Sequence, residues 1–301
     1  MTLALLGLYL AATGVLLPRR LAGSARVQAR LQTRPLLGVA LWLALMASFT
    51  VALVLAAHHA FEPAAHEPAG LIGLFPHLEP TGPVLPHTHD WWLLATAGAL
   101  LTGLLAAVGA RTGRARRRHR AVLDVVAVRD RRWGALVLEH THPTIYCLPG
   151  RRSRVVLSRG ALRLLDERQL AAAVAHEHGH IRGRHHLFRL PVDTFALLLG
   201  PLPLARLGRS EVALLLEMAA DDAALAEVSR SELASALCAL AVSGTTPGGT
   251  WGVASTGVLA RVRRLARPGS GRRRQLSWRL GVLTLPAVPA LPYLLACAPH
   301  P

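Results

Sequence analysis

Four long apolar runs divide the chain, and segments rich in arginine or histidine separate them. The runs cover about residues 2–17, 36–57, 91–110 and 280–299. A helix needs about 20 apolar residues to cross the hydrocarbon core of a bilayer, so the first run is slightly short. The pattern predicts four transmembrane helices. For the fourth run, which contains Pro286, Pro289 and Pro292, a buried core helix is the alternative.

The segment between the third and fourth runs, residues 111–279, has mixed patterning. Short β-branched runs at 121–128, 134–138 and 154–157 are bounded by proline and glycine, which predicts short strands. Helical periodicity follows them. The sequence therefore predicts a mainly α membrane protein with an α+β domain inserted before its last span.

Capping residues indicate where the helices of this domain begin. Asp166 followed by Gln169 is typical of a capping box and predicts a helix that runs to about His186. Pro191 is expected to close that segment, because proline removes a backbone donor. Ser210 is the predicted N-cap of the next helix. The residues with candidate chemistry fall on these two helices.

Charge is unevenly distributed along the chain. All 34 basic residues are arginine, against 17 acidic residues, and the formal charge is +17. The arginines cluster beside the apolar runs, at 18–34, 111–120 and 267–279, with Trp278 as the single interleaved aromatic residue of the kind that stacks on bases. Contacts with the lipid bilayer are therefore expected, and direct nucleic-acid binding is not.

The same distribution predicts the orientation in the membrane, because positively charged loops stay on the cytoplasmic side. All three arginine clusters share that side only if both termini are outside, the 58–90 loop is extracellular and residues 111–279 are cytoplasmic. The expected location is the plasma membrane. The 58–90 loop has six histidines and could sense a metal ion or pH, although an ordinary hydrophilic loop is the simpler interpretation.

A His-Glu-x-x-His motif lies on the first predicted helix, where residues 176–180 read His-Glu-His-Gly-His. Histidines four positions apart share one face of a helix, so His176 and His180 can bind one zinc ion. A hydrolytic zinc needs a third protein ligand and an open position for water. Glu217, 37 positions after His180, is the candidate third ligand, whereas His178 faces elsewhere.

Two further acidic residues complete the predicted site. Asp221 lies one helical turn after Glu217, where its carboxylate could hold a ligand imidazole by its other nitrogen. Glu177 is rotated by about 100° from His176 around the helix. It is the candidate general base, which takes a proton from the attacking water and passes it to the leaving amine. One catalytic zinc per chain is therefore predicted. The alternative is an ordinary surface helix with three histidines.

Three nearby residues have weaker signals. Cys147 could ligate the metal as a thiolate, but a packed structural cysteine is the simpler interpretation. His185 and His186 could supply an oxyanion contact or a proton, but ordinary surface histidines are more common. The chain has three widely separated cysteines, which do not predict a disulfide framework.

These motifs together resemble peptidase family M56, the family of the BlaR1/MecR1 antibiotic-sensing membrane metallopeptidases. The resemblance rests on the four-span plan, the motif at 176–180, the Glu-x-x-x-Asp pair and the segment 149–162, and it covers about residues 1–299. It implies a gluzincin-type zinc metallopeptidase domain in which the two motif histidines and Glu217 bind zinc and Glu177 is the base.

Two features of this sequence differ from the pattern of family M56. Its receptor members continue into a penicillin-binding sensor domain, which is expected to be absent here because the chain stops at Pro301. In the family an acidic residue often follows the motif, and residues 184–186 read Arg-His-His instead.

The resemblance implies a membrane zinc endopeptidase that cleaves a cytoplasmic regulator, such as a BlaI-like DNA-binding repressor. One alternative is a quality-control peptidase of the M48 kind, which uses the same zinc-binding pattern and cleaves damaged membrane proteins. Another is a non-catalytic membrane receptor with a structural zinc, against which the intact Glu177 argues. The range of substrates distinguishes the first two.

Overall fold

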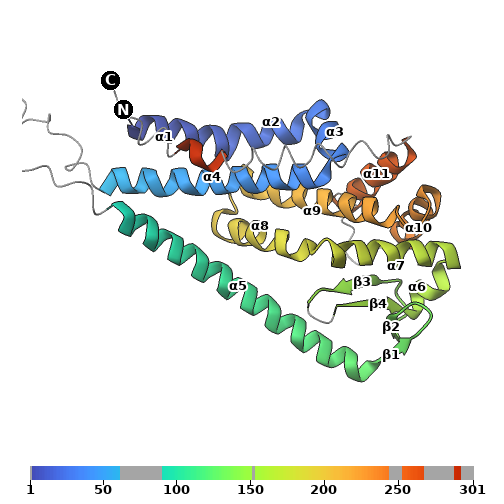
Figure 1. Ribbon diagram of the computed structural model, residues 1–301. Helices are drawn as coiled ribbons and strands as arrows, with labels where there is room; N and C mark the ends of the chain where they lie inside the picture. Colours follow the sequence, from blue (N-terminus) through green and yellow to red (C-terminus); the bar gives the residue numbers. More distant parts are fainter. Residues whose placement is uncertain (1, 62–89, 151–152, 244–252, 268–287, 293–301) are drawn as a thin grey trace, which may run out of the picture.

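The computed structural model is mostly helical, with one small sheet (Figure 1). It describes residues 2–61, 90–150, 153–243, 253–267 and 288–292. Among these residues, the helical segments that are long and apolar enough to cross a membrane are Leu3–Gly23, Pro35–Ala60 and Ala95–Val126. They overlap the first three predicted runs, at 2–17, 36–57 and 91–110. Most of the fourth, at 280–299, and of the 58–90 loop lies outside the described residues.

The first two candidate spans form an N-terminal helical hairpin (Figure 1). Its elements are α1 (Thr2–Ala11), the π-helical turn η1 (Ala12–Leu16), α2 (Leu17–Gly23), α3 (Ala25–Thr33) and α4 (Pro35–Phe61). The first helical segment is longer than predicted, because the helix continues through η1 and past the first arginines. A hydrogen bond of 2.6 Å between the hydroxyls of Tyr9 and Ser48 joins α1 to α4.

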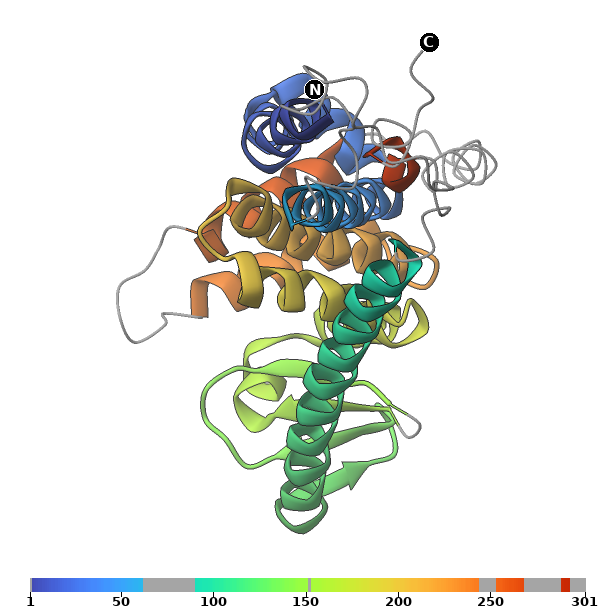
Figure 2. The same cartoon turned by 90° about the vertical axis from the view of Figure 1, so that its left-hand side faces the viewer.

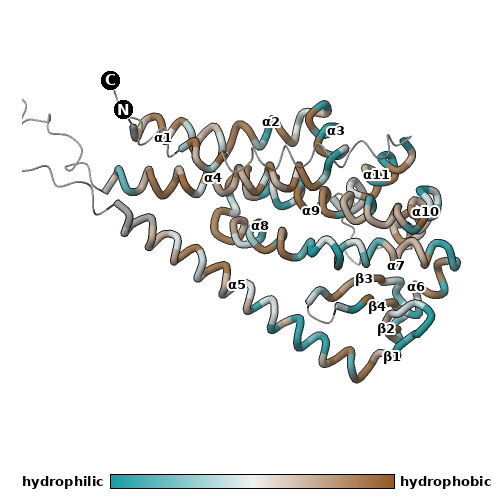
Figure 3. The backbone as a smooth tube through the Cα atoms, viewed as in Figure 1, coloured by the Kyte–Doolittle hydropathy of each residue, from teal (hydrophilic) through white to brown (hydrophobic). Residues whose placement is uncertain are grey.

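The third span is part of a much longer helix, α5 (Asp90–Val126). It is largely apolar in its first half, hydrophilic over its arginine-rich part, and apolar again at its C-terminal end (Figure 3). The arginine-rich segment 111–120 therefore continues the helix, in keeping with the high helix propensity of arginine and alanine. The strand predicted at 121–128 is wrong for most of its length, since extended backbone begins only at Ala127.

The sheet has four short strands: β1 (Ala127–Asp130), β2 (Ala135–Leu138), β3 (Ile145–Leu148) and β4 (Arg154–Ser158). Their order is β1-β2-β4-β3, in which β2 and β4 are parallel and the other two pairs are antiparallel. The sequence patterning did not predict β3. It is an edge strand of this sheet.

The remaining helices are α6 (Arg159–Leu164), α7 (Glu167–Arg182), α8 (His185–Leu199), α9 (Pro203–Ala224), α10 (Arg230–Ser243) and α11 (Val253–Ala266). The predicted capping box is confirmed: Asp166 accepts a hydrogen bond of 2.8 Å from the Gln169 amide, and Gln169 accepts one of 3.1 Å in return. The helix ends earlier than predicted, at Arg182, and Pro191 lies inside α8 rather than closing the segment.

The predicted N-cap at Ser210 is wrong. α9 begins at Pro203, because a proline fits the first helical position, where no backbone donor is needed. Ser210 lies two turns inside the helix and donates a hydrogen bond of 3.0 Å back to the carbonyl of Leu207.

The molecule is built in layers (Figure 2). The N-terminal helices lie on one side of α8 and α9, and the sheet lies on the other side of α7. A buried cluster that includes Trp42, Phe195 and Leu215 joins α4, α8 and α9. A second cluster, which includes Leu157 and Leu170, joins the sheet to α7. The middle layer is therefore held from both sides, and its helices α7 and α9 carry the predicted site residues.

Candidate metal centre

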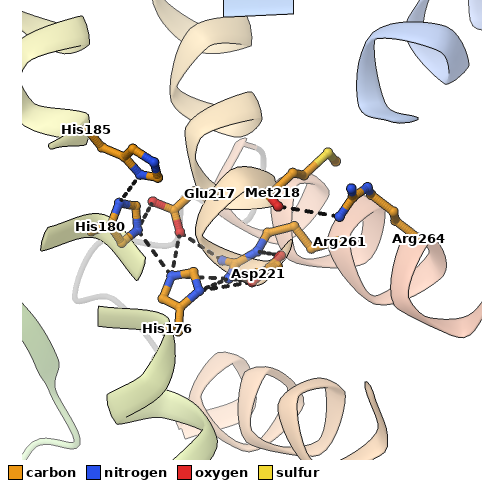
Figure 4. Close-up of polar contacts among 8 residues, drawn as sticks. All are labelled: His176, His180, His185, Glu217, Met218, Asp221, Arg261 and Arg264. Carbon is orange, nitrogen blue, oxygen red and sulfur yellow. Dashed lines mark hydrogen bonds and ion pairs between the residues drawn. The ribbon is translucent and has the colours of Figure 1, made fainter. Parts of the chain in front are cut away.

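His176 and His180 of α7 converge on Glu217 of α9 (Figure 4). One ligand atom from each residue lies within 4.8 Å of the other two. The two Nε2 atoms are 3.2 Å apart, and each is 3.3 Å from a carboxylate oxygen of Glu217. Two imidazole nitrogens and one carboxylate oxygen around one point are a donor set that suits zinc.

A close approach of two helices brings these side chains together. Gly179 of α7 faces α9, and a Cβ atom on it would lie 2.9 Å from the carbonyl oxygen of Ala220. The glycine therefore lets α7 approach the backbone of α9 next to Glu217. The motif spacing places the two histidines on one face of α7. The close contact between Gly179 and Ala220 then brings that face against Glu217.

Asp221 lies where the sequence analysis placed it. Its Oδ1 is 3.0 Å from Nδ1 of His176, and its side chain has no exposed surface. The nitrogen of His176 that points away from Glu217 is therefore held by a carboxylate. Such a contact fixes the orientation and tautomer of a metal-binding imidazole.

Arg261 of α11 is a member of the site that the sequence analysis missed (Figure 4). Its guanidinium donates two hydrogen bonds to Asp221, of 2.8 Å from Nε and 2.6 Å from Nη2. A third, of 3.0 Å, goes from Nη1 to Glu217. The bidentate contact has the fork geometry that makes arginine a strong partner for carboxylates.

A signal for Arg261 was present in the helical pattern. Arg261 lies one turn before Leu265, and both side chains are buried. An arginine on the apolar face of an amphipathic helix requires a buried acidic partner. The neighbouring Arg263 and Arg264 obscured that signal, since the segment 257–267 looks like an evenly basic surface helix.

Buried charges in the site stabilise one another. Burial would raise the pKa of Asp221, but hydrogen bonds from Arg261 and His176 outweigh it and lower that pKa. Burial would also raise the pKa of Glu217, which hydrogen bonds to His176 and His180 and the charge of Arg261 hold well below its usual value. Both carboxylates therefore stay ionised at neutral pH, as a metal site requires.

His185 is not the surface histidine that was expected. It is the first residue of α8, its exposed fraction is 4%, and its Nδ1 lies 2.9 Å from Nδ1 of His180 (Figure 4). A sequence separation of five gives no helical signal for this contact, because residues five apart do not share a helix face.

A cleft of about 370 Å³ opens beside the three-residue cluster. Glu177, His180 and Glu217 line it together with the end of the edge strand β3, and its other lining residues include Tyr146, Cys147, Pro149, His185, His186 and Arg189. The predicted base and two of the three predicted ligands therefore face a common space that a substrate can enter.

Cys147 lies in β3, on the wall of this cleft. Burial raises the pKa of its thiol to about 12, and the neighbouring carboxylate of Glu177 contributes. The side chain therefore stays a thiol at neutral pH, which favours the packing role over metal ligation. Neither Cys147 nor His178 belongs to the metal-binding cluster found among the described residues.

The comparison with protein families corrects the resemblance to family M56. The model of Peptidase family M48 matches residues 110–243, which is less than half of the chain but includes His176, Glu177, His180, Glu217 and Asp221. No curated protein and no solved structure matches the chain.

The error has a simple cause. Both families use a His-Glu-x-x-His motif followed by a glutamate in a membrane protein, so the motif and the spans do not distinguish them. The match ends before α11 and does not reach Arg261. The segment that carries the candidate metal centre is therefore similar to the M48 metallopeptidases.

Proposed function

We propose that this protein is a membrane-embedded zinc endopeptidase of the M48 kind, with its active site on the cytoplasmic side. The main support is one arrangement: Glu177 lines the same open cleft as His180 and Glu217, two members of the cluster that His176 completes. A structural zinc site would instead need four protein ligands and no open position.

His176, His180 and Glu217 would hold one zinc ion. Bound there, the ion would supply Lewis acidity toward a peptide carbonyl and the attacking water. Asp221 would keep the His176 ring turned toward the ion, and Arg261 would keep Asp221 in place through its two hydrogen bonds.

Glu177 would act as the general base. Its position on the cleft wall allows its carboxylate to receive a proton from the water that attacks the scissile carbonyl. The same carboxyl group would then deliver the proton to the nitrogen of the leaving amine. The thiol of Cys147 beside it is held protonated and offers no competing nucleophile.

The edge strand β3 suggests how a substrate is bound. An extended peptide can add to a free strand edge through main-chain hydrogen bonds, which are independent of side-chain identity. β3 reaches the cleft through Tyr146 and Cys147. Backbone recognition of this type fits a peptidase that accepts many unfolded or damaged segments, rather than one regulator.

Three candidate spans support the placement of the cleft near a membrane surface. Figure 1 shows α3 and the C-terminal end of α5 at the end of the candidate spans where the sheet lies. Both elements contain arginine-rich sequence or lie next to it. Arg264 of α11 donates a hydrogen bond of 2.8 Å to the carbonyl of Gln32, which ties the site to the end of α3. Cytoplasmic segments of membrane proteins are therefore the proposed substrates.

The test compares new protein N-termini in cells that produce the wild type or Glu177→Gln. This substitution keeps the side-chain size and removes the base, so metal binding should persist while cleavage stops. We expect many membrane proteins with new N-termini near the cytoplasmic surface in the wild-type cells, and their absence with the variant.

Other outcomes would overturn parts of the proposal. One or two cleaved soluble proteins would mean a dedicated regulator instead of broad quality control. Identical N-termini in both cell lines, together with zinc bound by the wild type, would favour a receptor with a structural metal. A wild-type protein that binds no zinc would contradict the metal centre itself.

A further inference from the structure

His185 lies outside the predicted ligand set, yet it contacts one of the ligands. Its imidazole meets that of His180 edge-on, with ring centroids 4.8 Å apart and ring planes at 88°. The two Nδ1 atoms are 2.9 Å apart, a hydrogen-bond distance. Figure 4 shows the two rings facing one another on the side of His180 that points away from His176.

The backbone is shaped to make this contact. In a continuous helix, residues five apart lie on different faces. Here α7 ends at Arg182, and Arg184 adopts the left-handed conformation, with φ 48° and ψ 38°, before α8 begins at His185. A non-glycine residue in this region is uncommon and costs free energy. The break turns His185 back toward His180.

Gly183 provides the room for the ring. A Cβ atom at this position would lie 2.3 Å from Nε2 of His185 and 2.6 Å from its Cδ2. Since the backbone of Gly183 is right-handed, with φ −74° and ψ −6°, its conformation would accept alanine. The imidazole itself is therefore the main obstacle to a side chain there.

The direction of the hydrogen bond follows from the geometry. Nε2 of His180 faces Nε2 of His176 and a carboxylate oxygen of Glu217, so a metal there would use its lone pair. The ring proton of neutral His180 is then on Nδ1, which donates to Nδ1 of His185. Nδ1 of His185 accepts this hydrogen bond in the tautomer that carries its ring proton on Nε2.

We propose that His185 is a positioning residue of the metal centre: its Nδ1 accepts a hydrogen bond from Nδ1 of His180 and keeps Nε2 of His180 aimed at the metal. It does for His180 what Asp221 does for His176. The inference rests on the proposed metal site and adds a specific arrangement to it, in which one ligand imidazole is oriented by a carboxylate and the other by a second imidazole.

The test measures zinc affinity by chelator competition on the full chain in detergent micelles. His185→Leu removes the acceptor, and His185→Asn keeps one, because the amide Oδ1 can take the place of Nδ1. Loss of a group that orients a ligand typically weakens metal binding by about 10–100-fold. We expect a loss of this size for His185→Leu and recovery of most of it for His185→Asn. His140→Leu replaces an exposed histidine away from the cleft and serves as the control.

The outcomes are distinguishable. Equal zinc affinity of the wild type and His185→Leu would overturn the role of His185 while leaving the metal centre intact. If His185→Asn were as weak as His185→Leu at the same unfolding temperature, ring packing would explain the effect and the hydrogen bond would not. A wild type that binds no zinc would instead contradict the proposed function.

Gly183→Ala tests the same hydrogen bond through the residue that borders the His185 ring. The new methyl group must displace the His185 ring, so zinc binding should weaken in the wild-type background. In the His185→Asn background the shorter side chain leaves space for the methyl group. Gly183→Ala should therefore weaken zinc binding much less there. Additive effects of the two substitutions would show that they act independently and would contradict the proposal.

Discussion

The buried ion pair between Arg261 and Asp221 lies beside the candidate metal centre. The Asp221 side chain has no exposed surface, and its contacts within the described residues are with Arg261 and His176. A buried carboxylate without its cation must either take up a proton or draw water into the core. Either change would release His176 from its orientation.

We therefore expect Arg261→Leu to destabilise the protein and to weaken zinc binding. Removal of one partner from a buried pair typically costs about 3–5 kcal/mol. Arg261→Lys keeps the charge but cannot form the bidentate contact, and should have a smaller effect. The measurement is the unfolding temperature in detergent, followed by zinc affinity.

Arg263→Leu is the matched control, because it removes an exposed arginine from the same helix. We expect Arg263→Leu to change neither the unfolding temperature nor the zinc affinity. If Arg261→Leu behaved like this control, the hydrogen bonds from Arg261 to Asp221 would have no energetic role in the site.

The residues of the site divide into those that spacing predicts and those that it does not. His176, His180, Glu217 and Asp221 follow helical periods of four, so their shared faces can be read from the sequence. Arg261 comes from another helix, forty positions after Asp221, and its position depends on how α11 packs. The place of Arg261 on the apolar face of α11 indicates that it is buried, but the local pattern does not show which carboxylate it contacts.

The crossing of α7 and α9 is the contact between elements that brings the histidines to Glu217. It depends on Gly179, where a Cβ atom would lie 2.9 Å from the carbonyl oxygen of Ala220 and 3.1 Å from its Cα. These are backbone atoms in the middle of a buried helix, so they cannot move aside as a flexible side chain would.

We expect Gly179→Ala to push the two helices apart. Overpacking of this kind costs about 1–3 kcal/mol, and the wider spacing should weaken zinc binding because Glu217 moves away from the histidines. Gly113→Ala is the control, since a Cβ atom there would meet nothing within 4 Å. In a helix, alanine at that position should be neutral or slightly stabilising. Equal zinc affinity for the two variants would contradict the role assigned to the crossing.

Element boundaries were predictable where a capping signal was strong. The pair of Asp166 and Gln169 determined the start of α7, because both reciprocal hydrogen bonds form locally. The helix boundaries predicted from Ser210 and Pro191 were wrong, because residues that favour helix ends are also tolerated within helices. Ser210 bonds back to a carbonyl one turn earlier, and Pro191 follows the first turn of α8. β3 was missed although β2, which has the same length, was predicted.

At the scale of the whole molecule, apolar runs predicted candidate spans but not their lengths. Composition shows where a bilayer can be crossed, whereas helix propensity decides how far the helix continues into water. α5 extends through ten residues rich in arginine before it ends at Val126. The predicted resemblance to family M56 was also wrong at this scale, because families M56 and M48 share the local motif and the membrane setting.

The arginine clusters predict a single orientation, which labelling of single cysteines can test. In a variant without the three native cysteines, Arg26→Cys and Arg131→Cys introduce thiols at exposed positions in α3 and after β1. Thr81→Cys introduces one into the 58–90 segment. We expect a membrane-impermeant maleimide to label only Thr81→Cys in intact cells, because positively charged segments are retained in the cytoplasm.

Permeabilised cells provide the control, since all three cysteines should then react. Labelling of Arg26→Cys and Arg131→Cys in intact cells would invert the orientation and place the cleft outside, where cytoplasmic segments could not be substrates. Labelling of only one of them would mean that α3 and the sheet lie on opposite sides of the membrane. The hydrogen bond from Arg264 to the carbonyl of Gln32 argues against that result, because it joins α11 to the end of α3 over 2.8 Å. The orientation of the N-terminal hairpin and that of the metal centre should therefore be determined together.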